Sequence, residues 1–307
     1  MKYYYLSDIH IDHRSARIQK FIPELTSEEW EPESNTLIIA GDISPRMTQQ
    51  KLFISECSAW FKDVIVALGN HDYILEGVGA DGLLRRHMKD MDFSNVHILT
   101  PGNVFENDEA VFFGGTMWTD YGGRDKGNMG LAKMYMPELN YLYAGDLCDE
   151  HDTFIAALEA FDQHGYEGKL KICVTHHLPN EDSIDPEYEH SLLNAAFQAG
   201  VSDHLVGKFD LWIHGHTHKV MEHYTCFSVL VLCNPYGYQH ECDGFRPRSF
   251  TIENRFHLKE EGSHFYGDFE TSASAMRHVQ TLNKEVQDRT VIDFHKTILT
   301  QEGELIK

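Results

Sequence analysis

The stretch TLIIAGDIS (36–44) combines the two features that decide the fold of this chain, a short apolar run and polar residues directly after it. A brief apolar run without alternation is typical of a strand that is buried on both faces of its sheet. Gly41 and Asp42 follow at the carboxyl end of the predicted strand. The pattern therefore predicts a buried strand that delivers a carboxylate to one edge of a sheet.

The same combination recurs along the first two-thirds of the chain. Further apolar runs that predict buried strands lie at 3–7, 64–69, 96–99, 171–175 and 211–215. Segments 48–63 and 149–163 carry apolar residues at spacings of three and four, which predicts amphipathic helices. Hairpins are expected at 103–115, 221–235 and 249–259. This alternation predicts an α/β fold in which helices cover two sheets.

Polar residues follow five of the predicted strands. In open α/β sheets, the loops at the carboxyl ends of the strands meet in one crevice, where ligands bind. We therefore expect five separate segments to bring carboxylate, imidazole and amide groups to the same rim. In chain order these segments are SDIH (7–10), GDIS (41–44), GNHD (69–72), THHLP (175–179) and HGHTH (214–218).

These segments contain more candidate metal ligands than one ion needs. A catalytic zinc takes three protein ligands and a water, whereas seven candidates divide over two ions if one carboxylate bridges. Imidazole, carboxylate and amide groups suit Mn²⁺, Fe or Zn²⁺ better than Mg²⁺ or Ca²⁺, which prefer oxygen ligands alone. His177 and His214 are expected to pack behind the ligands. The seven candidates are Asp8, His10, Asp42, Asn70, His176, His216 and His218.

The order D-I-H … G-D … G-N-H-D … H … G-H-T-H resembles the signature of the calcineurin-like metallophosphoesterases, and the resemblance covers roughly residues 1–255. It implies a four-layer α/β/β/α sandwich with two mixed β-sheets between helices. CNPYGY (233–238) is similar to the family's Asn-Pro turn, although the family usually has glycine and serine there.

The resemblance also implies a role for each motif residue. One metal would be held by Asp8, His10 and His218, and a second by Asn70, His176 and His216, with Asp42 as the bridge. His71 would be the catalytic histidine over the leaving group, and Asp72 would orient its ring.

The expected activity is that of a dinuclear-metal-dependent phosphoesterase, a metal-dependent phosphoric ester hydrolase with two divalent ions as cofactors. It would hydrolyse a small phosphomonoester or phosphodiester by in-line attack of a metal-bridging hydroxide, while His71 donates a proton to the leaving oxygen. The sequence leaves three properties open: the preferred ester, the native metal among Mn, Fe and Zn, and the oligomeric state.

The charge of the chain bears on its partners. The chain has a formal net charge of −22 and lacks the cluster of basic residues that nucleic-acid-binding proteins use. Nucleic acid is therefore an unexpected partner, and a compact phosphoester is favoured as the substrate. The alternatives are a metal-dependent nuclease and a non-catalytic scaffold with the same fold. The scaffold is disfavoured because His71 and all seven candidate ligands are present.

Three further expectations concern organisation and location. The phosphoesterase domain is expected to span 1–260, and 261–307 is expected to be a polar appendage with one possible helix at 272–286. The glycine-rich segment 120–130 is expected to form a surface loop. No apolar run approaches the roughly 20 residues of a membrane span, and no signal peptide is recognisable, so a cytoplasmic protein is expected.

Overall fold

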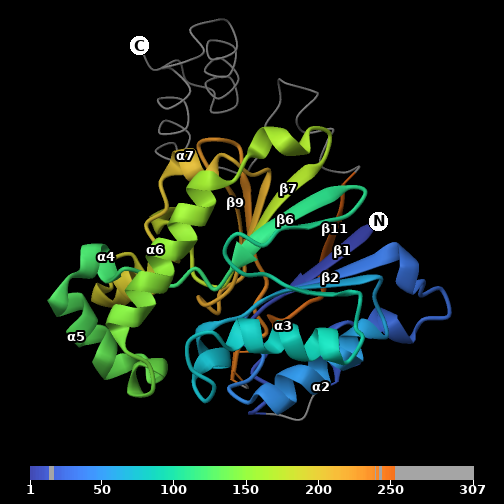
Figure 1. Ribbon diagram of the computed structural model, residues 1–307, viewed down its shortest axis with the longest axis horizontal. Helices are drawn as coiled ribbons and strands as arrows, with labels where there is room; N and C mark the ends of the chain where they lie inside the picture. Colours follow the sequence, from blue (N-terminus) through green and yellow to red (C-terminus); the bar gives the residue numbers. More distant parts are fainter. Residues whose placement is uncertain (14–16, 239, 242–243, 253–307) are drawn as a thin grey trace, which may run out of the picture.

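Two mixed sheets form the centre of the molecule (Figure 1). The structure, a computed structural model, describes residues 1–13, 17–238, 240–241 and 244–252. In the first sheet β1 to β4 run parallel, and only β11 is antiparallel, alongside β1. The strand order is β11-β1-β2-β3-β4, with bounds Arg248–Thr251, Lys2–Leu6, Asn35–Ala40, Asp63–Ala67 and Val96–Ile98.

The second sheet has a parallel centre and antiparallel edges. β6, β7, β8 and β10 are parallel, while β5 pairs antiparallel with β6 and β9 with β10. The β5–β6 and β9–β10 pairs confirm the hairpins predicted at 103–115 and 221–235. The order is β5-β6-β7-β8-β10-β9, with bounds Phe105–Glu106, Ala110–Gly115, Leu170–Thr175, Leu211–His214, Leu230–Cys233 and Met221–Tyr224.

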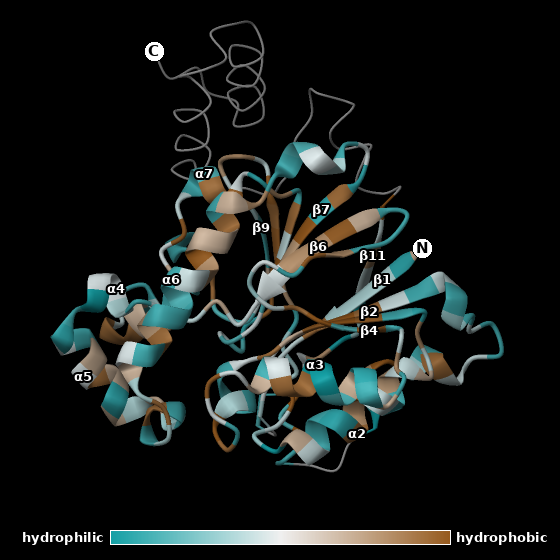
Figure 2. Ribbon diagram, viewed as in Figure 1, coloured by the Kyte–Doolittle hydropathy of each residue, from teal (hydrophilic) through white to brown (hydrophobic). Residues whose placement is uncertain are grey.

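Three apolar cores separate four layers, and the alternation along each strand explains them. On β1, Tyr3 and Tyr5 face the core between the two sheets, whereas Tyr4 and Leu6 face the core under the helices. A third core lies between the six-stranded sheet and α6, where Phe154 packs. Figure 2 shows the strands as largely hydrophobic ribbons between helices of mixed hydropathy. The predicted α/β fold with two mixed sheets between helices is confirmed.

The helices lie outside the sheets. α2 and α3 run along the five-stranded sheet, and α6 lies beside the six-stranded sheet (Figure 1). Within the described ranges, no helix combines the length and apolar character needed to cross a bilayer. The α-helices are α1 (Ile18–Phe21), α2 (Met47–Ser58), α3 (Ala80–Asp90), α4 (Tyr121–Arg124), α5 (Lys126–Tyr135), α6 (Ala144–Ala160) and α7 (Asp203–Val206).

Both predicted helices exist, but their ends differ from the prediction. α2 ends at Ser58 rather than at residue 63, and beyond it Phe61 packs edge-on against Tyr4 and Trp30. α6 begins at Ala144 rather than at residue 149, because Leu147 extends its buried stripe, and it ends at Ala160 rather than at residue 163, because Phe161 is extended.

The surface loop expected at 120–130 is wrong for its second half, which forms the start of α5, where Asp125 caps the helix by accepting from the amide of Asn128. The first half, labelled α4, is a single left-handed turn: its four residues all have positive φ, and Asp120 accepts from the amide of Gly122. The second half of the hairpin predicted at 249–259 and the appendage at 261–307, with its helix at 272–286, lie outside the described residues.

Candidate metal centre

The loops after β1, β2, β3, β7 and β8 bring the predicted residues together at the carboxyl ends of the strands. Three groups of metal-binding side chains have ligand atoms within 4.8 Å of one another. The groups share members, so they form one continuous cluster across both sheets. They are Asp8, His10 and His218; His10, Asp42 and His71; and Asp8, Asp42 and His176.

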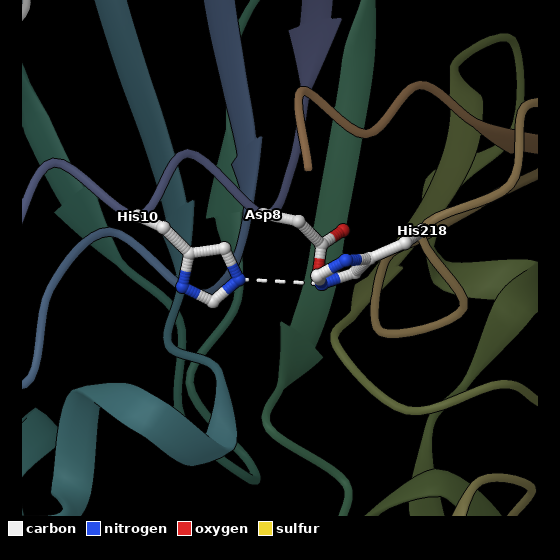
Figure 3. Close-up of side chains that lie close together, drawn as sticks. All are labelled: Asp8, His10 and His218. Carbon is white, nitrogen blue, oxygen red and sulfur yellow. Dashed lines mark hydrogen bonds and ion pairs between the residues drawn. The ribbon is translucent and has the colours of Figure 1, made fainter. Parts of the chain in front are cut away.

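Asp8, His10 and His218 point toward one another (Figure 3). The Nε2 atoms of His10 and His218 are 3.2 Å apart, and Asp8 Oδ1 is 3.3 Å from His218 Nε2. His218 donates from Nδ1 to Glu241 Oε2 at 2.8 Å, so in its neutral form Nε2 carries the lone pair. Acceptor atoms of these three side chains thus converge on one point, as they do around a cation, and we call this group the first convergence.

A second convergence involves Asn70 and His176. His176 donates from Nδ1 to the carbonyl of Ala40 at 2.9 Å, which leaves the lone pair of the neutral ring on Nε2. That atom lies 2.9 Å from Asn70 Oδ1. The His216 ring is 5.0 Å from the His176 ring, and its buried Nε2 has no hydrogen-bond partner among the described residues. An unpartnered buried imidazole nitrogen beside other acceptors fits a metal position.

Asp42 lies between the two convergences. Its Oδ2 is 3.7 Å from His10 Nε2, and its Oδ1 is 3.5 Å from His176 Nε2. The donor set on both sides mixes imidazole with carboxylate or amide oxygen, which fits divalent ions of intermediate hardness. The side chains present therefore fit two metal ions that share one carboxylate.

The backbone at these residues is unusual. Asp8, His10, Asp42, His216 and His218 all have positive φ, at 52°, 46°, 58°, 69° and 52°. Residues other than glycine rarely enter this left-handed region, and such residues cluster at functional sites. The chain turns sharply as each strand ends, and these turns bring the side chains together.

Three glycines allow the loops to approach closely. A Cβ on Gly41 would collide with the His176 ring, and one on Gly69 would collide with the Asp42 carboxylate. On Gly215 it would lie 2.6 Å from the carbonyl oxygen of Ala40. The glycines of the GD, GN and GH pairs are therefore needed for packing around the site.

The acidic groups shift the pKa values of their neighbours. Burial alone would raise the pKa of Asp42, but His176, His71 and His10 lower it well below its usual value. Burial opposes protonation of His176, yet Asp42 and Asp8 raise its pKa to about 9. The two buried carboxylates, Asp8 and Asp42, thus favour a positive charge close to them.

His71 and Asp72 are placed differently from each other. The half-buried His71 ring lies 4.9 Å from the His10 ring, and its backbone amide donates to Asp42 Oδ1 at 2.9 Å. The Asp72 carboxylate is fully buried and accepts hydrogen bonds from the backbone amides of Asp42, Ile43, Ser44 and Gly69. The expected contact between Asp72 and the His71 ring is absent from this set of partners. Asp72 instead joins the loops after β2 and β3.

Asp72 has an unusual pKa for a carboxyl group that accepts so many hydrogen bonds. Burial and the nearby Asp42 raise the pKa of Asp72 to about 7, although the backbone donors act in the opposite direction.

His177 and His214 lie behind the cluster, as expected. His177 Nδ1 is 3.1 Å from the carbonyl oxygen of Thr116, and His214 Nδ1 is 2.9 Å from that of Gly215. Burial lowers the pKa of His177 to about 3 and that of His214 to about 4.

Two acidic residues beside the cluster were missed by sequence reasoning. Glu138, in the short helix Pro137–Asn140, is 3% exposed; burial raises the pKa of its carboxyl group, and the nearby Asn70 side chain acts in the opposite direction. Glu241 accepts from His218, as described above. Neither lies in a motif or directly after a predicted strand, so no sequence signal identifies them.

Comparisons with known proteins agree with this geometry. The family model for calcineurin-like phosphoesterases matches residues 1–220. "Uncharacterized protein L509" of Acanthamoeba polyphaga mimivirus is 24% identical over 271 residues, which cover 80% of this chain and 94% of that protein. Among solved structures, the phosphopantetheinyl hydrolase PptH of Mycobacterium tuberculosis superposes with a TM-score of 0.62 at 18% identity. The match covers 82% of this chain and 96% of that one, and it shows a shared fold.

Proposed function

The chain belongs to the calcineurin-like phosphoesterase family, and we propose that it is a dinuclear-metal-dependent hydrolase of a small phosphomonoester or phosphodiester. The observation that carries the proposal is the position of Asp42. Its two carboxylate oxygens lie 3.7 Å from His10 Nε2 and 3.5 Å from His176 Nε2, one on each side. A carboxylate in this position can serve two ions at once, as a phosphoryl clamp requires.

In this proposal the two convergences become two metal sites. When bound, two divalent ions would offset the charge of the phosphoryl oxygens and lower the pKa of a coordinated water toward about 7. The first site would use Asp8, His10 and His218, the second Asn70, His176 and His216, and Asp42 would belong to both.

We assign proton donation to His71. Its ring is half-buried, so a substrate can reach it, and it lies against His10 at the edge of the cluster. The amide of His71 donates to Asp42, which fixes the backbone next to the proposed bridge. From there the ring can hold a proton and donate it to the leaving oxygen, a step worth about 10²- to 10⁴-fold in rate.

The charge of the molecule supports a compact substrate. Asp8, Asp42 and Glu241 contribute three negative charges at or beside the site, and two divalent ions would contribute four positive ones, so the ions would outweigh these carboxylates. A small phosphoester would experience this local field. A long polyanion would also meet the surface of a chain whose formal net charge is −22.

The test measures hydrolysis and metal content together. Metal-free protein is titrated with Mn²⁺, Fe²⁺ or Zn²⁺ and assayed with phenyl phosphate, p-nitrophenyl phosphate and bis(p-nitrophenyl) phosphate. We expect His71→Ala to keep both ions and to lose about 10²- to 10⁴-fold in turnover. The loss should be larger for phenyl phosphate, whose leaving group needs a proton more than p-nitrophenolate does.

His164→Ala is the matched control, because His164 is exposed and its ring is paired with the side chain of Gln163 rather than with a residue of the cluster. It should leave turnover and metal content unchanged. Asp42→Ala should lower occupancy of both metal positions together. No hydrolysis of any ester with any of the three metals would overturn the proposal in favour of a non-catalytic scaffold.

A further inference from the structure

Residues 234–238 and 241 follow β10 and lie beyond residues 1–220, which the family model matches. This segment runs beside the loop that carries Asp8. The amide of Ser7 donates to the carbonyl of Asn234 at 3.1 Å, and Tyr236 donates back to Ser7 at 2.9 Å. Gly237 then donates to the carbonyl of Asp8 at 2.9 Å. These backbone bonds hold the segment against the first of the two convergences.

Glu241 is seated by the same segment. Its Oε2 accepts from the Tyr238 amide at 2.7 Å, and its own amide donates to the carbonyl of Tyr238 at 2.9 Å. Gly237 has φ of +74°, and a Cβ there would lie 2.8 Å from Glu241 Oε2. The tight turn thus leaves space for the carboxylate only because residue 237 is glycine.

The carboxylate acts on one side of His218 and leaves the other side free. Glu241 Oε2 accepts the Nδ1 proton at 2.8 Å, which fixes both the tautomer and the ring plane. Nε2 then faces Asp8 Oδ1 at 3.3 Å and His10 Nε2 at 3.2 Å. A carboxylate behind an imidazole orients the ring and makes it a better metal ligand.

Tyr238 confines the second histidine of this group. Its ring stacks on His10 with centroids 4.5 Å apart and an interplanar angle of 23°, and it lies 4.8 Å from the His218 ring. The same short segment therefore contacts both imidazoles of one convergence. His176, in the other convergence, is oriented by the backbone carbonyl of Ala40.

We propose that Glu241 is a positioning residue that strengthens only the metal site formed by Asp8, His10 and His218. This inference rests on the proposed two-metal function and adds to it an asymmetry between the two sites. The site with Asn70, His176 and His216 does not depend on Glu241.

The test is metal binding, measured without substrate. Calorimetric titration of the metal-free protein with Mn²⁺ should resolve two binding events in the wild type. Glu241→Ala should weaken one of them by about 10- to 100-fold and leave the other unchanged. Electron paramagnetic resonance gives a second readout, because the signal of a coupled Mn²⁺ pair should be replaced by that of an isolated ion at the same added metal.

Glu241→Gln separates positioning from loss of the fold. A glutamine Oε1 can still accept from His218 and from the Tyr238 amide, so this variant should recover most of the affinity lost in Glu241→Ala. Glu222→Gln is the matched control, since Glu222 pairs with Arg248 at 3.4 Å and has no described contact with the cluster. It should bind both ions as the wild type does.

The outcomes distinguish the two proposals. If the wild type binds fewer than two ions, the proposed function fails. If the wild type binds two ions and Glu241→Ala binds both with unchanged affinity, only the role of Glu241 is overturned. The role of Glu241 is also overturned if Glu241→Ala lowers the affinity for both ions equally. It is overturned as well if Glu241→Gln binds the metal no more tightly than Glu241→Ala does.

Discussion

The loops of the five-stranded sheet supply carboxylate, amide and imidazole groups to the candidate metal centre, whereas those of the six-stranded sheet supply histidines alone, and the two sets are held differently. In the five-stranded sheet the loops bind one another through the backbone. The amides of Ile9 and His10 both donate to the carbonyl of Asp42, and the Asp72 carboxylate accepts four backbone amides. These loops form a framework of backbone bonds, and the segment after β10 adds its own backbone bonds with Ser7 and Asp8.

The histidines of the six-stranded sheet take their positions from outside that sheet. His176 donates to the carbonyl of Ala40, and the amide of His216 donates to Asp8 Oδ1 at 3.0 Å. His218 donates to Glu241, in the segment after β10. The comparison indicates that the loops of one half are joined mainly through the backbone, whereas the histidines of the other half are placed by contacts with the first half and with residue 241.

The largest effect should come from breaking the framework at Asp72. An Asp72→Asn side chain has one acceptor oxygen instead of two and presents an NH₂ group to backbone amides that need an acceptor. A buried donor left without a partner costs about 1–3 kcal/mol, so we expect the free energy of unfolding to fall by at least about 2 kcal/mol. Urea denaturation measures the change.

Glu33→Gln serves as the control for this substitution, because Glu33 is an exposed carboxylate in the short helix Pro32–Ser34. It should stay within about 0.5 kcal/mol of the wild type. An Asp72→Asn protein as stable as the Glu33→Gln protein would contradict the framework role of Asp72.

An intermediate effect is expected where the two halves meet, at Gly215. A Cβ at this position would lie 2.6 Å from the Ala40 carbonyl, 2.8 Å from Ser7 Cβ and 2.9 Å from Asp8 Oδ2. Gly215→Ala should therefore push the loop with His216 and His218 away from the framework, at a cost of about 1–3 kcal/mol in stability. Because these histidines belong to different proposed sites, calorimetry should show weaker binding of both ions.

Gly82→Ala is the matched substitution for Gly215. Gly82 lies inside α3, and a Cβ there meets nothing within 4 Å. This variant should keep both binding events and gain about 0.5–1 kcal/mol in stability. If Gly215→Ala lowers the affinity for only one of the two ions, the two halves do not meet at Gly215 as described.

The smallest effect should come from Glu138, which supports the framework side. Its buried carboxyl group lies beside the Asn70 side chain, whose Oδ1 is 2.9 Å from His176 Nε2. Glu138→Ala should let the side-chain amide of Asn70 rotate and should lower the affinity for one ion by no more than about 10-fold. Glu138→Gln keeps an acceptor and should restore the affinity. In a Mn²⁺ titration the double variant Glu138→Ala/Glu241→Ala should bind both ions more weakly than the wild type does. If the two single variants each lower the affinity for the same ion, the assignment is contradicted.

The sequence predicted the parts of the molecule that depend on local pattern. The buried run at 36–41 is β2, Asn35–Ala40, and Asp42 follows it as expected. The partners of Asp72 and the roles of Glu138 and Glu241 were not predictable, because they arise from contacts between segments far apart in the chain. The start of α5 was mistaken for part of a loop because Gly127 and Gly130 mask a helix that begins at the capping Asp125, whereas Gly122 and Gly123 do form a left-handed turn.

The glycines at the strand ends have a consequence for comparing related sequences. At Gly41 and Gly69 one methyl group would meet the His176 ring and the Asp42 carboxylate. A duplicated copy of this chain could thus lose the proposed metal sites through a single alanine while every proposed ligand is retained. Survival of the ligands is therefore a weaker sign of an active enzyme than survival of the ligands together with these two glycines.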